Sequence, residues 1–406
     1  MDIHDIRAQF PILSETIHGK HPLVYLDNAA TSQTPKRVVE AIEHAYFTQK
    51  ANVHRGVHCL SQKATAAMEK GRSAVREFIG APSEAEVIFT RGTTEALNLV
   101  AASYGELLSP GDLVVITQME HHSNIVPWQL LRDRRGIRIK VVPVLDDGTL
   151  DMDVYRRLLE ESPRLVSVTQ ISNVLGTVNP IREMAAMAHD AGAVFVCDGA
   201  QGVAHGPVDV LDLDVDFYAF SAHKMYGPTG IGALYGKREL LEKMPPYQGG
   251  GEMIGHVSFD HGTTWADLPY KFEAGTPDFV GAAAIVEAIG FMQSTGIEAM
   301  KAHEEDLLNY ATERMKEAIP DIHIYGTAPH KASLISFLIP GVHHYDTGVL
   351  LDQLGIAVRT GHHCTQPLME RFGIEGTVRA SFAAYNTRRE IDAFISALIR
   401  VNSMLR

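Results

Sequence analysis

Short apolar segments alternate with longer, helix-like amphipathic segments through the first two-thirds of the chain. Such alternation predicts a mostly parallel β-sheet covered by helices on both faces. In a sheet of this kind, polar residues at the carboxyl ends of the strands converge on one crevice. The seven segments expected to form strands are residues 86–89, 113–117, 137–142, 165–169, 193–197, 215–220 and 231–235.

The pattern changes near residue 245, where a Gly-rich stretch begins that contains an expected hairpin around His261 and Gly262. A long helix from about Phe279 then leads to a second lobe. Its expected elements are helix 297–319, strands near 322–325 and 332–339, helix 345–354 and a terminal helix after residue 386. We therefore expect a large domain over residues 20–290 and a small α+β domain formed by residues 1–19 and 291–406. Three apolar residues of the N-terminal segment should pack on the small domain: Ile6, Phe10 and Ile12.

Length and composition indicate the general class of protein. At 406 residues the chain exceeds the usual size of one hydrophobic core, which agrees with two lobes. No apolar run approaches transmembrane length, and the first residues lack the basic and apolar regions of a signal peptide, so we expect a soluble, cytoplasmic protein. With 36 basic and 49 acidic residues, the net charge of -13 argues against nucleic acid or an anionic membrane as the main partner.

Asp198 and Lys224 form the most informative pair in the sequence, because each follows an apolar strand. Pyridoxal phosphate needs a lysine amine for a Schiff base with its aldehyde, and a carboxylate that keeps its pyridine nitrogen protonated. The alternative is a helix-capping aspartate and a solvated lysine. Polar neighbours suited to a phosphate and a phenolic oxygen favour the cofactor: Gln201, Ser221 and His223.

Thr93 and Thr94 lie where a helix expected over residues 96–108 begins. Free N-H groups at a helix start, next to hydroxyl groups, can bind a phosphate. Alone, the same residues are an ordinary capping arrangement. With Ser221 and His223 in the same chain, they become the expected phosphate site.

His121 lies in Glu120-His121-His122-Ser123-Asn124, directly after the strand expected at 113–117. An imidazole at this place could lie over a planar cofactor and exchange protons, since histidine titrates near neutrality. The alternative is a capping Ser123 with two solvent-facing histidines, and the spacing alone does not decide between them.

The three cysteines lie far apart without a C-x-x-C motif, which fits a reducing compartment and no disulfide framework. Cys364 follows two histidines on a Gly-containing loop, where imidazoles can stabilise the nucleophilic thiolate. Cys197, in an apolar strand, and Cys59 are expected to be ordinary small side chains.

Arg359 and Arg379 both lie in short apolar strands of the second lobe. A guanidinium there needs a carboxylate partner, either the carboxylate of an amino-acid substrate or an internal acid. A metal site is not expected. His54 and His58 stand at helical spacing, but no third ligand is evident nearby.

These motifs together resemble those of the class V aminotransferase-like enzymes, and within them the Suf-type (group II) cysteine desulfurases. The specific motif is Arg359-Thr360-Gly361-His362-His363-Cys364. Its cysteine on a short loop resembles group II, whereas group I enzymes carry their cysteine on a longer, Ser-rich loop. The resemblance implies a fold-type I pyridoxal-phosphate-dependent transferase, with a mostly parallel seven-stranded sheet, helices on both faces and a smaller α+β domain. It extends over essentially the whole chain through Tyr25-Leu26-Asp27-Asn28-Ala29-Ala30, Val53-His54-Arg55-Gly56, Arg91-Gly92-Thr93-Thr94-Glu95, Met119-Glu120-His121-His122, Ser172-Asn173-Val174-Leu175-Gly176, Asp198-Gly199-Ala200-Gln201, Ser221-Ala222-His223-Lys224 and Glu273-Ala274-Gly275-Thr276-Pro277.

The resemblance also implies a role for each motif residue. Lys224 would hold the cofactor, Asp198 its pyridine nitrogen and Gln201 its phenolic oxygen, while His121 stacks on its ring. The phosphate would be bound by Thr93, Thr94, Ser221 and His223, and by Thr276 from the other subunit of a homodimer. The substrate would be bound by Asn173, Arg379, Arg359 and His54.

The implied reaction converts L-cysteine to L-alanine with a persulfide on Cys364, and supplies sulfur for iron-sulfur cluster assembly through a Suf acceptor protein. L-Selenocysteine remains open as a second substrate. His343 is a candidate docking residue for the acceptor, with a solvated loop histidine as the alternative. Two other functions stay open: an ordinary aminotransferase, which needs no thiol, and a catalytically silent cofactor-binding scaffold.

Overall fold

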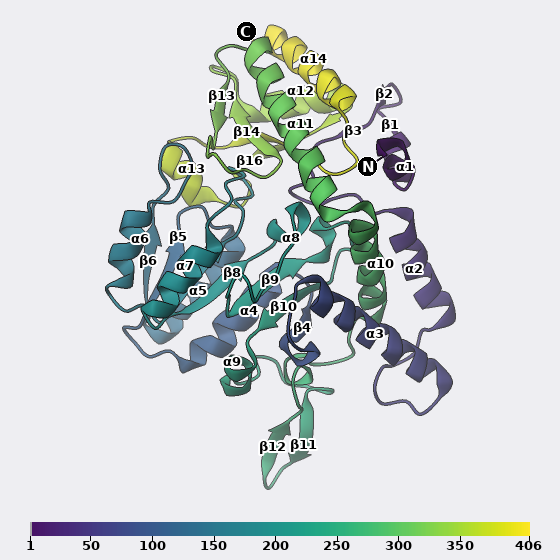
Figure 1. Ribbon diagram of the computed structural model, residues 1–406, viewed down its shortest axis with the longest axis vertical. Helices are drawn as coiled ribbons and strands as arrows, with labels where there is room; N and C mark the ends of the chain where they lie inside the picture. The colour runs from purple at the N-terminus through teal and green to yellow at the C-terminus, as the bar shows by residue number, and fades with distance from the viewer. Residues whose placement is uncertain (1) are drawn as a thin grey trace.

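The structure is a computed structural model that describes residues 2–406 (Figure 1). Its central sheet has seven strands, which are β4 (Val87–Thr90), β5 (Leu113–Thr117), β6 (Arg138–Val142), β7 (Leu165–Thr169), β8 (Val194–Asp198), β9 (Phe217–Ser221) and β10 (Gly232–Gly236). Their order is β4-β10-β9-β8-β7-β5-β6. Only β10 is antiparallel to its neighbours. The predicted mostly parallel sheet is confirmed, with strand ends shifted by at most two residues.

The inner strands β5, β7 and β9 are buried at every position because helices cover both faces of the sheet, whereas the edge strand β6 is partly exposed. In β5, Leu113 and Val115 belong to one hydrophobic cluster, whereas Val114 and Ile116 belong to another. Successive side chains of a strand point to opposite faces, so both faces are buried. The first face carries α3 (Cys59–Phe78), α7 (Ile181–Asp190) and α10 (Phe279–Thr295), and the second carries α4 (Thr93–Ser103) and α5 (Val126–Arg135).

The second lobe, at the top of Figure 1, is built on a four-stranded antiparallel sheet. Its strands, in spatial order, are β13 (His323–Tyr325), β14 (Leu334–Leu338), β17 (Thr377–Ser381) and β16 (Arg359–Gly361). The helices of this part of the chain are α11 (Ile297–Ala318), α12 (His344–Gln353), α13 (Gln366–Phe372) and α14 (Arg388–Leu405). A separate hydrophobic core fills this lobe, which includes Leu307, Phe337 and Phe394.

Further short elements complete the chain. They are α1 (Ile3–Arg7), β1 (Thr16–Ile17), β2 (His21–Pro22), β3 (Val24–Tyr25), α2 (Lys36–Thr48), α6 (Met152–Leu159), α8 (Gly202–His205), α9 (Arg238–Lys243), β11 (Ile254–Ser258), β12 (Gly262–Trp265) and β15 (Ile356–Ala357). The expected hairpin is β11 and β12, which projects from the body at the bottom of Figure 1. Between residues 2 and 406 no single helix is long and apolar enough to cross a membrane, and α10 and α11 reach that length only as a pair bent by 74°.

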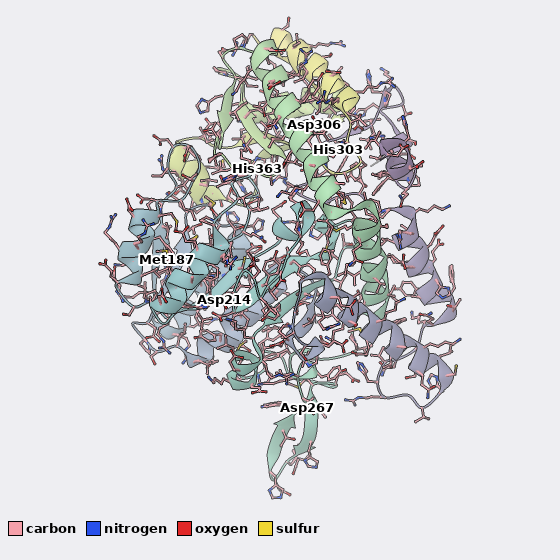
Figure 2. The ribbon with its side chains drawn as sticks, viewed as in Figure 1. Met187, Asp214, Asp267, His303, Asp306 and His363 are labelled. Carbon is pink, nitrogen blue, oxygen red and sulfur yellow. The ribbon has the colours of Figure 1, made fainter. Side chains whose placement is uncertain are left out.

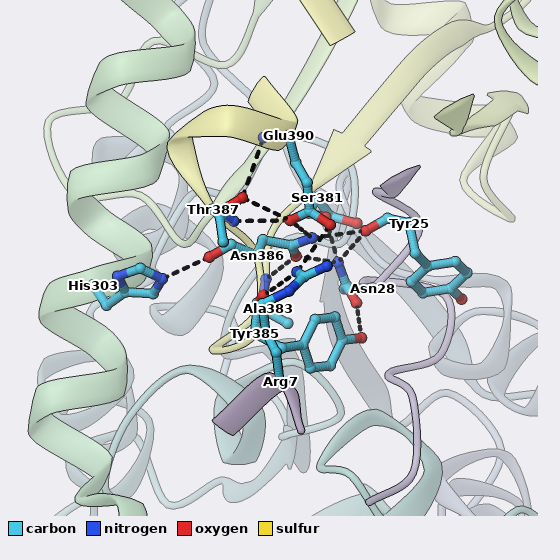
Figure 3. Close-up of polar contacts among 10 residues, drawn as sticks. All are labelled: Arg7, Tyr25, Asn28, His303, Ser381, Ala383, Tyr385, Asn386, Thr387 and Glu390. Carbon is cyan, nitrogen blue, oxygen red and sulfur yellow. Dashed lines mark hydrogen bonds and ion pairs between the residues drawn. The ribbon is translucent and has the colours of Figure 1, made fainter. Parts of the chain in front are cut away.

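The N-terminal segment lies at the joint between the lobes. Phe10 is buried against Tyr385, with ring centroids 4.6 Å apart. Arg7 Nη1 donates to the Tyr385 carbonyl at 2.6 Å and to Glu390 Oε1 at 2.9 Å (Figure 3). The prediction that Ile12 packs here is wrong: it is 43% exposed, because the 3₁₀ turn Pro11–Ser14 directs Leu13 inward instead.

Candidate active site

A cavity of about 200 Å³ lies at the carboxyl ends of the central strands, between the two lobes. Loops of the large sheet form one wall of the cavity. Strands β16 and β17 and the loop between β16 and α13 form the other wall. Figure 2 shows His363, which lines the cavity, at this junction. All predicted site residues except His54 and Thr276 line it: Thr93, Thr94, His121, Asn173, Asp198, Gln201, Ser221, His223, Lys224, Arg359, Cys364 and Arg379.

Asp198 and Lys224 enter this cavity from neighbouring parallel strands. Asp198 ends β8, is 3% exposed, and accepts a hydrogen bond from the Ala200 N-H at 3.0 Å. Lys224 ends the 3₁₀ turn that follows β9. Burial lowers the pKa of Lys224, and the Asp198 carboxylate opposes this effect. A lysine with a lowered pKa presents more of the neutral amine, which is the form that acts as a nucleophile or base.

Hydroxyl groups gather where α4 begins. Ser221 Oγ accepts the Thr93 N-H at 2.8 Å and lies 2.8 Å from Thr93 Oγ1. Thr94 Oγ1 lies 2.7 Å from Ser123 Oγ. Gly92 precedes the helix with a φ of 145°, and a Cβ there would come within 2.9 Å of Ser221 Oγ. The glycine thus allows the close approach of β9 to the helix start, where N-H and hydroxyl groups suit a phosphate.

His121 is neutral in this site. Burial lowers its pKa to about 3, and the positive charge of Lys224 acts in the same direction. Its Nδ1 accepts the Ser123 N-H at 3.1 Å, so the remaining ring proton is on Nε2. His122 is also half-buried and accepts the Gln366 N-H at Nε2, at 3.2 Å. The alternative of two solvent-facing histidines therefore does not describe His121.

Cys364 lies on the turn between β16 and α13 in a strained backbone conformation. His363 and Cys364 have φ values of 51° and 59°, which non-glycine residues rarely adopt. The large domain holds this turn, since the His122 N-H donates to the Cys364 carbonyl at 2.8 Å and Asn173 Nδ2 donates to the His363 carbonyl at 2.9 Å. The His363 ring is buried, and its Nε2 lies 2.9 Å from Thr377 Oγ1.

The other two cysteines lie elsewhere in the described part of the chain. Cys197 is fully buried in β8, where burial raises the pKa of its thiol. Cys59 is exposed at the start of α3. Of the three, Cys364 alone lines the cavity.

Arg359 and Arg379 face the same cavity but already share an internal acid, Asp27. Arg379 Nη2 donates to Asp27 Oδ1 at 3.1 Å, and Arg359 Nη1 lies 3.8 Å from Asp27 Oδ2. Arg379 is 1% exposed and also donates from Nη1 to the Asn173 carbonyl at 2.8 Å. The internal salt bridge therefore exists, and the sequence reasoning did not identify its acid.

His54 and Thr276 do not reach the cavity of their own chain. His54 Nε2 lies 2.9 Å from Glu69 Oε1, and His58 caps α3 instead of pairing with it. Thr276 is exposed and lines a separate hollow together with Arg91. Between residues 2 and 406 no group of three or more His, Cys, Asp or Glu side chains is placed to hold a metal.

Sequence reasoning also missed the support beneath His121. Glu120 is 0% exposed and accepts hydrogen bonds from Thr117 Oγ1 at 2.6 Å, the Thr169 N-H at 3.0 Å and Asn124 Nδ2 at 2.6 Å. Burial raises the pKa of Glu120 to about 8, against the effect of these three donors. The network ties the His121 segment to β7. An acid directly after a buried strand, inside a motif already singled out, was the available signal.

Comparison with known proteins identifies the family. The model of the family described as aminotransferase class-V matches residues 24–394, so the chain belongs to this family. Proteins named cysteine desulfurase from Dickeya dadantii and Haloferax volcanii are 50% and 48% identical to it, over 99% and 98% of this chain and 97% and 96% of theirs.

Solved structures agree with the fold. The apo cysteine desulfurase from Thermococcus onnurineus superposes with a TM-score of 0.94 at 40% identity, over 100% of this chain and 99% of that one. The cysteine desulfurase CsdA from Escherichia coli gives 0.91 at 40% identity, over 100% of both chains. The chain therefore has the class V aminotransferase fold, which is the fold type I of pyridoxal-phosphate-dependent enzymes, and its cavity offers the lysine, carboxylate and hydroxyl groups that this cofactor needs.

Proposed function

We propose that this chain is a pyridoxal-phosphate-dependent cysteine desulfurase of the Suf (group II) type, which converts L-cysteine to L-alanine and retains the sulfur as a persulfide on Cys364. The observation that carries the proposal is that Cys364 lines the same cavity as Asp198 and Lys224. An ordinary aminotransferase needs the lysine and the carboxylate but no thiol at this place. The relatives named cysteine desulfurase favour the same activity.

The cofactor would be held at four points of the cavity. Lys224 would bond to its aldehyde carbon, and Asp198 would keep its ring nitrogen protonated. The hydroxyl cluster where α4 begins would hold its phosphate. Gln201 contacts its phenolic oxygen, although in the described chain Gln201 Nε2 also donates to the Ala29 carbonyl at 2.7 Å. When bound, the cofactor supplies an electron-accepting ring for the charge that remains after a Cα proton leaves.

The side chains around it would perform the remaining work. Arg379 and Asn173 would bind the substrate carboxylate. Once the substrate amine has replaced Lys224 at the aldehyde carbon, the freed Lys224 would remove the Cα proton as a neutral amine. The Cys364 thiolate attacks the substrate sulfur: an S-S bond forms, the C-S bond breaks, and its electron pair stays on the carbon fragment, which takes up protons and leaves as alanine. Neutral His121 would donate a hydrogen bond from its Nε2-H to the reacting groups.

The test combines product analysis with mass spectrometry of the protein after treatment with L-cysteine. We expect alanine and one added sulfur on the peptide that contains Cys364. Lys224→Ala should abolish both products, whereas Cys364→Ala should bind cofactor but form neither persulfide nor alanine. Cys59→Ala, which changes an exposed thiol outside the cavity, is the matched control and should behave as wild type. A persulfide on Cys59 or Cys197, or a keto acid in place of alanine, would refute the proposal.

We also propose that the working unit is a homodimer. His54 and Thr276 lie outside the cavity of their own chain, and in a dimer they would complete the substrate and phosphate sites of the other subunit. A chain that remains monomeric at the assay concentration and is fully active would contradict this assignment.

The sulfur would pass in the cytoplasm to an acceptor protein of the Suf system, for iron-sulfur cluster assembly, and L-selenocysteine would be a second substrate. The support for an acceptor protein is the short turn that holds Cys364 between β16 and α13, because a persulfide on this turn cannot extend far from the cavity. His343 is exposed at the start of α12, and its Nε2 lies 3.6 Å from Glu375 Oε2, so it can face a partner. Equal saturating rates of alanine formation with small thiols alone and with an acceptor protein would exclude the acceptor step.

A further inference from the structure

The two arginines of the cavity lie side by side, and Asp27 neutralises one of their charges. Arg359 and Arg379 are directly paired across the antiparallel strands β16 and β17. Like charges in such positions repel each other. Asp27 lies between them, 3.1 Å from Arg379 Nη2 and 3.8 Å from Arg359 Nη1. The three side chains together therefore carry one positive charge.

The backbone around Asp27 is fixed, so its carboxylate stays with the arginines. Asp27 itself pairs with Ser381 in a parallel bridge, two residues beyond Arg379. Asn28 Nδ2 donates to the Ser381 carbonyl at 2.6 Å, and Asn386 Nδ2 donates to the Tyr25 carbonyl at 3.0 Å (Figure 3). The segment on either side of Asp27 is thus tied by buried amides to the end of β17 and to the loop that follows it.

Arg379 has a buried donor that no group of the described chain satisfies. Its Nη1 is bonded to the Asn173 carbonyl and its Nη2 to Asp27, whereas its Nε is buried without a partner. A buried N-H group without an acceptor is costly, so this donor favours a ligand oxygen. The cluster of Arg359, Arg379 and Asp27 consequently offers a single net positive charge. Arg359, which is 45% exposed and has only the 3.8 Å contact to Asp27, presents its N-H groups as well, so the cluster suits one carboxylate.

We propose that Asp27 determines the charge specificity of the site: it leaves enough positive charge for the α-carboxylate of a neutral amino acid and disfavours amino acids with an acidic side chain. An additional carboxylate beside this cluster would meet the Asp27 charge, because the α-carboxylate already matches the single net positive charge of the three side chains. The proposal rests on the proposed function, because it assumes that the cavity binds an amino acid at these arginines.

The test measures binding, not turnover. The holoenzyme is titrated calorimetrically with L-alanine and with L-aspartate, which differs by one negatively charged group. Asp27→Asn, which is isosteric, should shift the ratio of the two dissociation constants by about tenfold in favour of L-aspartate. Asp27→Glu keeps the charge and should leave the ratio within about threefold of wild type. Asp146→Asn, at a carboxylate that is 96% exposed, is the matched control and should change nothing.

If Asp27 only braces the arginines, Asp27→Asn weakens both amino acids equally. A ratio shifted by less than about threefold, or shifted toward L-alanine, overturns the proposal. Cofactor absorbance and the unfolding midpoint show whether the variant is folded. If it is not, Asp27→Ser, which removes the charge with a smaller side chain, is judged by the same ratio. Alanine formation from L-cysteine by the wild type separately tests the proposed function, so the two failures are distinguishable.

Discussion

Replacing Arg72 by methionine should strongly destabilise the large domain, because it leaves a buried carboxylate unpaired. Arg72 on α3 is 0% exposed and donates from Nη1 and Nη2 to the two oxygens of Glu273, at 2.7 and 2.9 Å. Methionine replaces most of the side-chain volume but none of the charge. Glu273, which is 9% exposed, then keeps only the Phe89 N-H at 2.7 Å among these bonds.

The expected loss of unfolding free energy depends on which partner of the pair is replaced, because the two partners keep different numbers of hydrogen bonds. Removing one partner of a buried ion pair costs about 3–5 kcal/mol of unfolding free energy. Glu273→Gln should cost less, about 1–3 kcal/mol, since Arg72 retains the Val87 carbonyl at 2.8 Å and Glu69 Oε2 at 3.3 Å. The double variant should be more stable than the sum of the single changes implies, by about 2 kcal/mol, because the unpaired charge is then gone.

The assay is denaturant unfolding followed by the fluorescence of Trp128, which is 0% exposed in the core of the large domain. Arg76→Met is the matched control: it lies one turn further along α3, and its pair with Glu77 is exposed, so a loss of at most about 1 kcal/mol is expected. An Arg72→Met variant as stable as Arg76→Met would refute the reasoning. The reasoning would also be refuted if the stability loss of the double variant equalled the sum of the losses of the two single variants.

Three further predictions concern the cavity. Asp198→Asn should keep cofactor bound through the phosphate site but slow turnover strongly, because an amide no longer favours a protonated ring nitrogen; unchanged turnover at full cofactor content would exclude the assigned role. In the wild type, His121 has a pKa of about 3 when folded and near 6.5 when unfolded, so between these values the unfolded chain binds the extra proton and the free energy of unfolding falls as pH falls, by up to about 1.4 kcal/mol per pH unit. His121→Gln should remove this contribution, so its stability should depend less on pH. Denaturant titrations of both proteins from pH 4 to 6.5 would show the difference. Thr276→Ala should weaken cofactor affinity in equilibrium dialysis of the dimer, and an unaltered affinity would remove Thr276 from the phosphate site.

The central sheet was predictable because its signal is local. Each strand is a short apolar run, and burial on both faces makes the run continuous, so β5, β7 and β9 could be placed within two residues. The polar residues at strand ends, such as Asp198, follow from the same rule about parallel sheets. Ile12 was mispredicted because its apolarity says nothing about the direction in which a 3₁₀ turn points it.

The contacts of the site were less predictable, because they join distant parts of the chain. The acid that pairs with Arg379 is 352 positions away, and the sequence contains 49 acidic residues from which to choose. Nothing in the local sequence indicates the positive φ values of His363 and Cys364, which are non-glycine residues. For the same reason, no helical or strand pattern could show that His54 turns toward Glu69.

The position of Cys364 depends on contacts from both lobes, so the proposed chemistry requires that the two lobes are packed together. Its turn begins in the small sheet, but the hydrogen bonds to its carbonyl and to that of His363 come from His122 and Asn173 of the large domain. The strain of two consecutive left-handed residues persists only where such contacts hold it. A displacement of the small lobe would therefore break these bonds, release the turn and move the thiol away from Lys224 at once. Docking of the two lobes is thus itself a requirement for bringing the proposed nucleophile to the cofactor site.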